Sequence, residues 1–202
     1  MKTQKLFYIF GFIFLLISVY MSVFLHLAHF YSLFSIGMFL ILFQIYNSIY
    51  KKSLFNKWKL KDFVIFFISL IIVSIIIDKI GIYLGYWIYP FYNTIFDEIL
   101  KYIFEWALAL TYFMAGLMIG ICLFKKARIN KQLSFLFSLL IFVTLIGFFT
   151  QYINQFSYSW KVLSMPITNY KIGGYFLIFQ TVGYWLMAII PFILYKIVDK
   201  RV

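Results

Sequence analysis

Residues 78–105 read DKIGIYLGYWIYPFYNTIFDEILKYIFE and hold four of the six acidic residues of a 202-residue chain. These four are Asp78, Asp97, Glu98 and Glu105. The stretch joins an apolar run at 63–80 to another at 99–124 and is rich in Tyr and Trp. It therefore predicts the outer ends of two helices, joined by an aromatic loop and carrying carboxylates on both sides of it.

The rest of the chain is strongly apolar: 65% of its residues are hydrophobic, 24% are aromatic and only 12% are charged. Apolar runs of about 20 residues recur, and each is long enough to cross a hydrocarbon core of roughly 30 Å. Such runs predict helices, because a membrane barrel shows short alternating strands instead. We expect an all-α polytopic membrane bundle, a single domain over residues 1–202. The six predicted transmembrane helices cover about 6–25, 31–50, 63–80, 99–124, 133–152 and 174–197.

Basic residues give this bundle an orientation. The net charge is +12, and fourteen of the 18 Lys and Arg residues lie at the two chain ends and in the linkers at 51–61 and 125–131. Positive charge concentrates on the cytoplasmic side of membrane proteins. We therefore expect a multi-pass protein of the cell membrane with both termini cytoplasmic. Bases that flank apolar spans contact anionic lipid headgroups, which argues against a nucleic-acid partner.

Part of the second half of the chain can be aligned with the central stretch. Placing Trp87 over Trp160 aligns Asp78 with Gln151, and two extra residues in the second loop bring Glu105 over Gln180. This alignment predicts a degenerate repeat, 63–124 and 133–197, in which only the first copy keeps its acids. Chance similarity between aromatic-rich membrane loops accounts for the alignment equally well.

Asp78 and Glu105 are the candidate catalytic residues. We expect Asp78 at the end of the third helix and Glu105 one to two turns inside the fourth, both near the outer side. Ionisable groups in membrane spans usually face a bundle interior or a cavity. Helical spacing places Ala109 and Tyr112 on the same face as Glu105. Desolvation favours the neutral form of a carboxyl group, which can then donate a proton to an apolar substrate.

Aromatic side chains surround these carboxyl groups in the sequence. Trp87, Trp106, Tyr112 and Tyr89 are the candidate substrate-binding residues, because aromatic faces attract a cation that forms beside them. A purely structural interpretation also exists, in which Asp78 caps a helix and the aromatic side chains form an interfacial belt. Asp97 and Glu98 match the charges that favour the first turn of a helix, so we expect them at the surface.

Metal binding is not expected. His26 and His29 lie three residues apart, but the chain has no further His and only one Cys, Cys122, to complete a ligand set. Interfacial polar residues are the better interpretation of the two histidines. We expect no metal and no cofactor.

The pattern Asp78, Gly85, Trp87 and Tyr89, followed on the next helix by Glu105 and Trp106, resembles the lycopene-cyclase domain of membrane carotenoid cyclases. The resemblance covers about residues 63–120. In that family an Asp ends one helix, a Gly-x-Trp-x-aromatic loop follows, and an acidic motif opens the next helix. This chain departs from the pattern at Tyr102, where the family has a proline, and at Trp106, where a second acid often lies.

The resemblance implies redox-neutral, acid-catalysed cyclisation or isomerisation of an isoprenoid or carotenoid lipid, without a consumed cofactor. It makes Glu105 the acid, makes Asp78 an orienting residue or a returning base, and makes Trp87 and Tyr112 walls around a carbocation. The alternative is a non-enzymatic membrane protein, either a transporter component or an assembly partner. The loss of acids from the second repeat favours that alternative.

Overall fold

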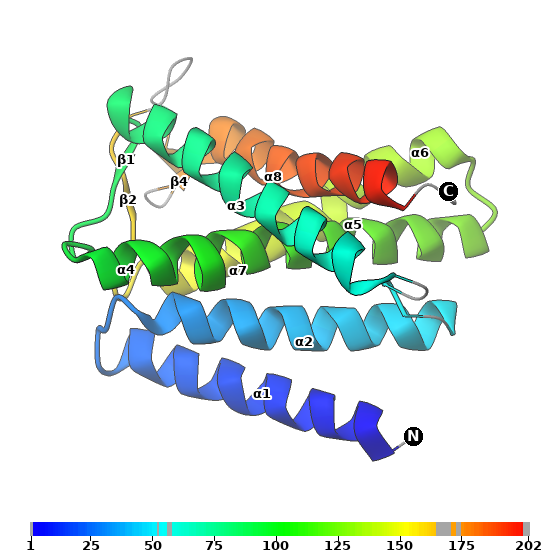
Figure 1. The fold of residues 1–202 in the computed structure, drawn as a ribbon. Coiled ribbons are helices and arrows are strands. Elements are labelled where there is room, and N and C mark those ends of the chain that lie inside the picture. The colour runs from blue at the N-terminus through cyan, green and yellow to red at the C-terminus, as the bar shows by residue number, and fades with distance from the viewer. Residues whose placement is uncertain (1, 52, 56–57, 165–170, 173–174, 200–202) are drawn as a thin grey trace.

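The structure is a computed structural model that describes residues 2–51, 53–55, 58–164, 171–172 and 175–199 (Figure 1). It is helical apart from two short ribbons, which confirms the all-α class. The helices are α1 (Lys2–Val23), α2 (Phe30–Tyr50), α3 (Leu60–Tyr83), α4 (Ile95–Leu100), α5 (Leu108–Lys126), α6 (Lys131–Phe137), α7 (Thr144–Asn154) and α8 (Leu177–Val198). The strands are β1 (Trp87–Ile88), β2 (Lys161–Val162), β3 (Lys171–Ile172) and β4 (Tyr175–Phe176).

Six helical stretches of the described residues are long and apolar enough to cross a membrane. Two of them contain a π-helical segment, η1 (Lys101–Ala107) between α4 and α5 and η2 (Ser138–Val143) between α6 and α7. The predicted spans at 31–50 and 133–152 agree with the structure to within two residues. The predicted start of the last helix at 174 lies outside the described residues.

The central helical stretch begins earlier than its apolar run. Thr94 is its N-cap and accepts a hydrogen bond from the backbone of Asp97, whose carboxylate in turn accepts from the backbone N–H of Thr94. This reciprocal capping adds a polar first turn, so the helix starts at Ile95 rather than at residue 99. Asp97 is buried, which corrects the expectation that it is a surface charge.

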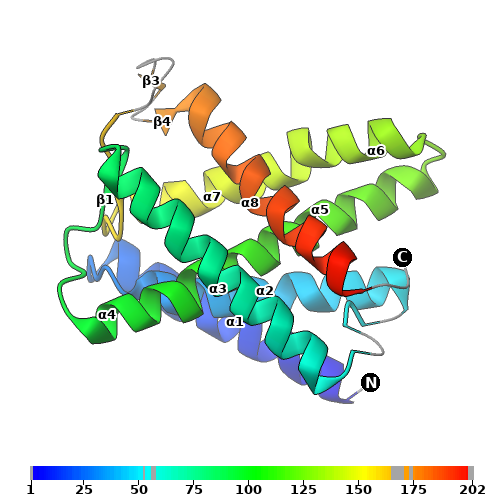
Figure 2. The ribbon, with the colours of Figure 1, turned by 45° about the horizontal axis from the view of Figure 1, so that its top comes forward.

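The stretch from α4 through η1 to α5 is the core of the bundle, with α2, α3 and α8 packed around it and α1 on the outer side of α2 (Figures 1 and 2). Small residues let α6, η2 and α7 approach it closely. A Cβ added at Gly116 would collide with Ile146, and one at Gly120 would lie 2.7 Å from the Ser138 hydroxyl. Glycines spaced four apart therefore serve the close helix packing that is common in membranes.

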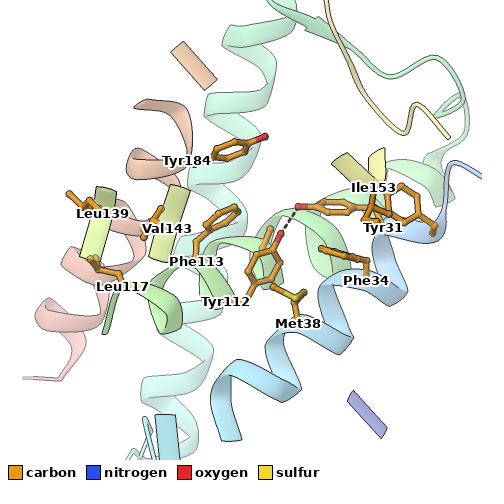
Figure 3. Close-up of a cluster of buried hydrophobic side chains, with 13 residues drawn as sticks. Tyr31, Phe34, Met38, Tyr112, Phe113, Leu117, Leu139, Val143, Ile153 and Tyr184 are labelled. Carbon is orange, nitrogen blue, oxygen red and sulfur yellow. Dashed lines mark hydrogen bonds between the residues drawn. The ribbon is translucent and has the colours of Figure 1, made fainter. Parts of the chain in front are cut away.

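A mixed aromatic and aliphatic core lies where four helical stretches meet (Figure 3). Tyr31 and Phe34 reach it from α2, Tyr112 and Phe113 from α5, and Tyr184 from α8. The Phe113 and Tyr184 rings are stacked, with their centroids 5.5 Å apart. These contacts fix α8 against the central helix, and α8 forms one wall of the candidate site.

The two ends of the bundle differ. The terminal end carries both chain termini, the α2–α3 linker and the α5–α6 turn (Figure 1). The ribbon end carries β1 and β2, which pair antiparallel with Trp87 opposite Val162 and Ile88 opposite Lys161. This ribbon joins the loop after α3 to the loop after α7, so it links the two halves of the predicted repeat.

Candidate functional site

Asp78 is buried inside α3 and has three partners. Its Oδ1 accepts a hydrogen bond from the Trp87 indole at 3.0 Å, and its Oδ2 accepts one from the Tyr102 hydroxyl at 2.7 Å. The Lys101 ammonium lies 3.2 Å from the same Oδ2. The sequence predicts Asp78 at the end of the third helix, whereas α3 continues to Tyr83. The carboxylate therefore lies a turn inside the helix, where protein groups replace its hydration.

Lys101 is the counter-charge that the sequence interpretation missed. Its side chain is 1% exposed, and its ammonium also contacts the Glu98 carboxylate at 2.9 Å and lies over the rings of Tyr89 and Tyr102. Glu98 in turn pairs with Lys79 at 3.3 Å. Glu98 lies in the first turn of α4 and is partly exposed, as expected, and it is also part of an ion-pair network. A buried lysine is tolerated because opposite charges and aromatic faces surround it.

Glu105 is also buried, but its partners differ from those of Asp78. Its Oε1 accepts a hydrogen bond from Ser32 on α2 at 2.9 Å and another from Tyr92 at 2.6 Å. Both donors stabilise the ionised carboxylate. The described residues donate no hydrogen bond to Oε2. Glu105 lies ten residues after the helix start, so it is deeper than the one to two turns that the sequence suggested.

Tyr92 comes from the loop between β1 and α4, outside the membrane-spanning stretches. Burial and the neighbouring Glu105 carboxylate raise the pKa of its hydroxyl far above the ordinary value. The hydroxyl therefore keeps its proton and remains a donor to Glu105. Tyr92 belongs to the stretch 78–105, so it is close to the carboxylates in the sequence. Ser32 is 73 residues away from Glu105, and nothing in the sequence indicates that the two side chains are in contact.

The π-helical segment places these contacts on two sides of one helix. Lys101 and Tyr102 bond to Asp78 on α3, whereas Glu105 bonds to Ser32 on α2. All three lie in η1. A π-helical turn is wider than an α-helical one and changes which side chains share a face, and such segments are frequent at functional sites.

A cavity of about 400 Å³ lies beside Glu105, between the central helix, α3, α7 and α8. Its polar lining residues are Glu105, Thr150 and Gln180. Its aromatic lining residues are Tyr31, Tyr86, Trp87, Tyr89, Trp106, Trp160 and Tyr184. Its volume is that of a small-molecule pocket. The cavity therefore places one carboxyl group against an apolar, aromatic surface.

Two of the helices that line the cavity, α3 and α8, lie next to each other over the central helix (Figure 2). Ile80 on α3 and Leu186 on α8 both line it and are about half exposed, at 54% and 51%. Gly183 lines it on α8, and a Cβ added there would meet nothing within 4 Å. We infer that these residues form the mouth of the cavity, between α3 and α8.

Four of the six predicted site residues line this cavity, namely Glu105, Trp87, Trp106 and Tyr89. Trp106 donates a hydrogen bond to the Tyr89 hydroxyl at 2.9 Å, and its ring lies 6.4 Å from that of Trp87. Asp78 and Tyr112 do not line it. Asp78 holds Trp87, and the Tyr112 hydroxyl lies 2.9 Å from that of Tyr31 (Figure 3). These two residues support the cavity wall from behind.

The two halves of the predicted repeat make the same contact at matching positions. The Trp160 indole donates to Gln151 at 3.1 Å, just as the Trp87 indole donates to Asp78, and each pair is nine residues apart. Two residues before each tryptophan the backbone has a positive φ, +69° at Gly85 and +54° at Tyr158. Common descent of the halves stays a prediction.

Residues that the alignment pairs with each other also line the same cavity. Glu105 and Gln180, which the alignment pairs, both line it, and so do Trp87 and Trp160. The cavity therefore lies between the two halves, with an acid on one side and an amide on the other.

These features define a helical bundle with the dimensions of a six-span membrane protein and a buried acid in an apolar cavity. The described residues contain no group of three or more His, Cys, Asp or Glu that could hold a metal ion. Comparisons with family models, with curated proteins and with solved structures found no match. The resemblance to the lycopene-cyclase domain therefore stays a prediction from the sequence.

Proposed function

We propose that this protein is a multi-pass membrane enzyme that protonates an isoprenoid or related apolar lipid and so cyclises or isomerises it. The observation that carries the proposal is the position of Glu105, a buried carboxyl group that lines an apolar cavity with aromatic walls. The inferred mouth between α3 and α8 supports a substrate dissolved in the membrane. Anionic lipid headgroups would surround the basic loops at the terminal end, which we place on the cytoplasmic side.

The proposed reaction begins with neutral Glu105. A carbon–carbon double bond of the substrate takes the carboxyl proton, its π electrons form the new C–H bond, and a carbocation remains on the neighbouring carbon. A second double bond attacks this cation and closes a ring, or a proton leaves directly. Loss of a proton from an adjacent carbon to the Glu105 carboxylate forms the product double bond and restores the acid. Atoms and electrons balance, so the substrate and its product have the same mass.

The other residues have supporting roles in this scheme. Ser32 and Tyr92 donate to Oε1 and stabilise the carboxylate that exists between the two proton transfers. The faces of Trp87, Trp106 and Tyr89 stabilise the cation. Asp78 is a positioning residue, because it reaches the cavity through the Trp87 indole.

Expression in cells that accumulate lycopene or other polyisoprenoids tests the proposal. We expect a new compound in the apolar extract with the mass of the compound it replaces but a different chromatographic retention. Glu105→Gln keeps the shape and the hydrogen-bond acceptor of the side chain but removes the acid. It should lower product formation by about 10²–10⁴-fold, the usual contribution of a general acid. Size-exclusion chromatography checks that the variant accumulates as folded protein.

Asp62→Asn is the control, because it makes the same acid-to-amide change at the start of α3, at the terminal end and away from the cavity lining. It should keep most of the product formation. If wild-type protein changes no compound in any extract, or if both variants retain equal activity, the catalytic proposal fails. The non-enzymatic alternative, a transporter component or assembly partner, would then be the better account.

A further inference from the structure

A second cavity, of about 590 Å³, lies at the terminal end of the bundle and has no part in the proposed chemistry. Three lysines line it: Lys125 at the end of α5, Lys131 at the start of α6 and Lys196 near the end of α8. We call it the lysine pocket. Tyr50 and Gln132 add further polar groups to its lining.

None of the three ammonium groups forms an ion pair within 4 Å in the described part of the chain. Each of the four ion pairs found there involves other residues, at the ribbon end of the bundle. Asp199, three residues after Lys196, is buried, accepts a hydrogen bond from Tyr195 and attracts the Lys196 charge, which Lys125 and Lys131 repel. Three like charges around one cavity repel each other, and an anion bound between them would relieve that repulsion.

The remaining lining is apolar. Ile121, Phe135 and Phe192 are partly buried and line the pocket together with Met118. Lys196 extends over the Phe192 ring, with its ammonium 5.5 Å from the ring centroid. The pocket thus combines cationic groups with a hydrophobic surface, at the end of two helices that are long and apolar enough to cross a membrane.

We propose that the lysine pocket binds the phosphate headgroup of an anionic phospholipid, with the start of an acyl chain against Phe135 and Phe192. Basic pockets between membrane helices bind such headgroups, and lysine binds phosphate as a point charge. The concentration of positive charge at one end explains why lysines occur there. It does not explain why three of them line a cavity with an apolar wall. The proposal is independent of the reaction at Glu105.

Native mass spectrometry in detergent tests the proposal, with dioleoyl phosphatidylglycerol as the probe and dioleoyl phosphatidylcholine as its neutral comparison. We expect one phosphatidylglycerol to bind selectively to the wild-type protein and to raise its melting temperature. Replacing Lys125, Lys131 and Lys196 together by Gln should weaken binding about a hundredfold, since each lysine near a phosphate contributes about fivefold. Replacing the same three by Arg should preserve binding.

The matched control replaces Lys5, Lys51 and Lys61 by Gln, which removes the same charge from exposed positions at the same end. It should retain selective binding. Equal losses in the two Gln variants would show only diffuse attraction and would overturn the proposal. So would equal stabilisation by soluble glycerol phosphate, which would assign the pocket to a free phosphate ester. If the pocket variant does not fold, Lys131→Glu alone, at an exposed position, makes the same test.

Discussion

At the scale of single residues, two of the buried carboxyl groups, those of Asp78 and Glu105, lie in contrasting surroundings. Asp78 has a buried ammonium and two hydrogen-bond donors around it, so its negative charge is compensated. Glu105 has two hydroxyl donors at one oxygen and an apolar cavity beside it. Carboxyl groups whose environments differ in this way often have different roles in one site. This contrast separates a positioning residue, Asp78, from the proposed acid.

The ion pair with Lys101 makes Asp78 a critical residue for stability. Asp78→Ala leaves the buried ammonium with only the partly exposed Glu98 and removes the acceptor for Trp87 and Tyr102. Loss of one partner from a buried pair costs about 3–5 kcal/mol, so we expect a clearly lower melting temperature in detergent. Lys79→Ala next to it, which breaks only a partly exposed pair, should change stability by about 1 kcal/mol or less. Equal melting temperatures for the two variants would contradict this assignment.

Sequence reasoning located the acids but not their partners. Acidic residues are so rare in this chain that Asp78 and Glu105 attract attention, and both are buried as expected. Lys101 is one of only four basic residues that lie outside the chain ends and the two basic linkers. A lysine in a composition count gives no sign of burial, although its spacing from Glu98 allowed an ion pair within the helix. Ser32 carries no signal at all, because its role arises from the packing of α2 against the central helix.

At the scale of elements, the apolar runs predicted all six helical stretches, because length and hydropathy largely decide a membrane span. Their ends shifted where polar residues joined the helix, as at Ile95. The π-helical segments η1 and η2 were not predicted. A π-helical turn depends on how neighbouring helices pack, and the hydrophobic pattern of a fully buried helix has no clear period from which to detect it.

The exposed lining residues on α3 and α8 lead to a prediction about access. Gly183→Phe adds a large ring at the mouth of the cavity, where a Cβ would have open space, so the protein should fold while its cavity becomes closed. In a variant that keeps Trp87 as its only tryptophan, lipids brominated on their acyl chains should quench the fluorescence. Adding Gly183→Phe should greatly weaken that quenching, and it should also lower product formation.

Ile178→Phe provides the control for this closure. Ile178 lies on the exposed side of α8 and is not part of the cavity lining. Its replacement should leave the quenching of Trp87 unchanged. Quenching that is insensitive to Gly183→Phe would mean that acyl chains do not enter between α3 and α8.

At the scale of the whole molecule, the predicted topology can be tested at the two ends of a single helix. α3 has 24 residues and therefore spans about 36 Å, enough to cross a hydrocarbon core. Lys61 near its start and Tyr83 at its end are both exposed, and the native Cys122 is buried. With a membrane-impermeant maleimide on intact cells, Tyr83→Cys should be labelled, whereas Lys61→Cys should be labelled only after permeabilisation. The reverse pattern would invert the orientation.

The arrangement of the two halves was only partly visible in the sequence. An alignment over Trp87 and Trp160 identified matching positions, and the structure places matching hydrogen bonds there. The alignment could not reveal that the β1–β2 ribbon joins the halves or that a cavity lies between them. Those features depend on how two helical pairs face each other, which a one-dimensional alignment does not contain.

In the proposed reaction, the unequal sides of the cavity would limit how a long substrate is processed. Among the described residues, Glu105 is the only acid that lines the cavity, and Gln180, its counterpart in the alignment, cannot protonate a double bond. A linear polyene with two identical ends therefore presents one end to the acid per binding event. It must leave and return in the opposite direction before its second end reacts. A time course of the proposed reaction should show singly modified molecules accumulating first, with doubly modified ones following after a lag.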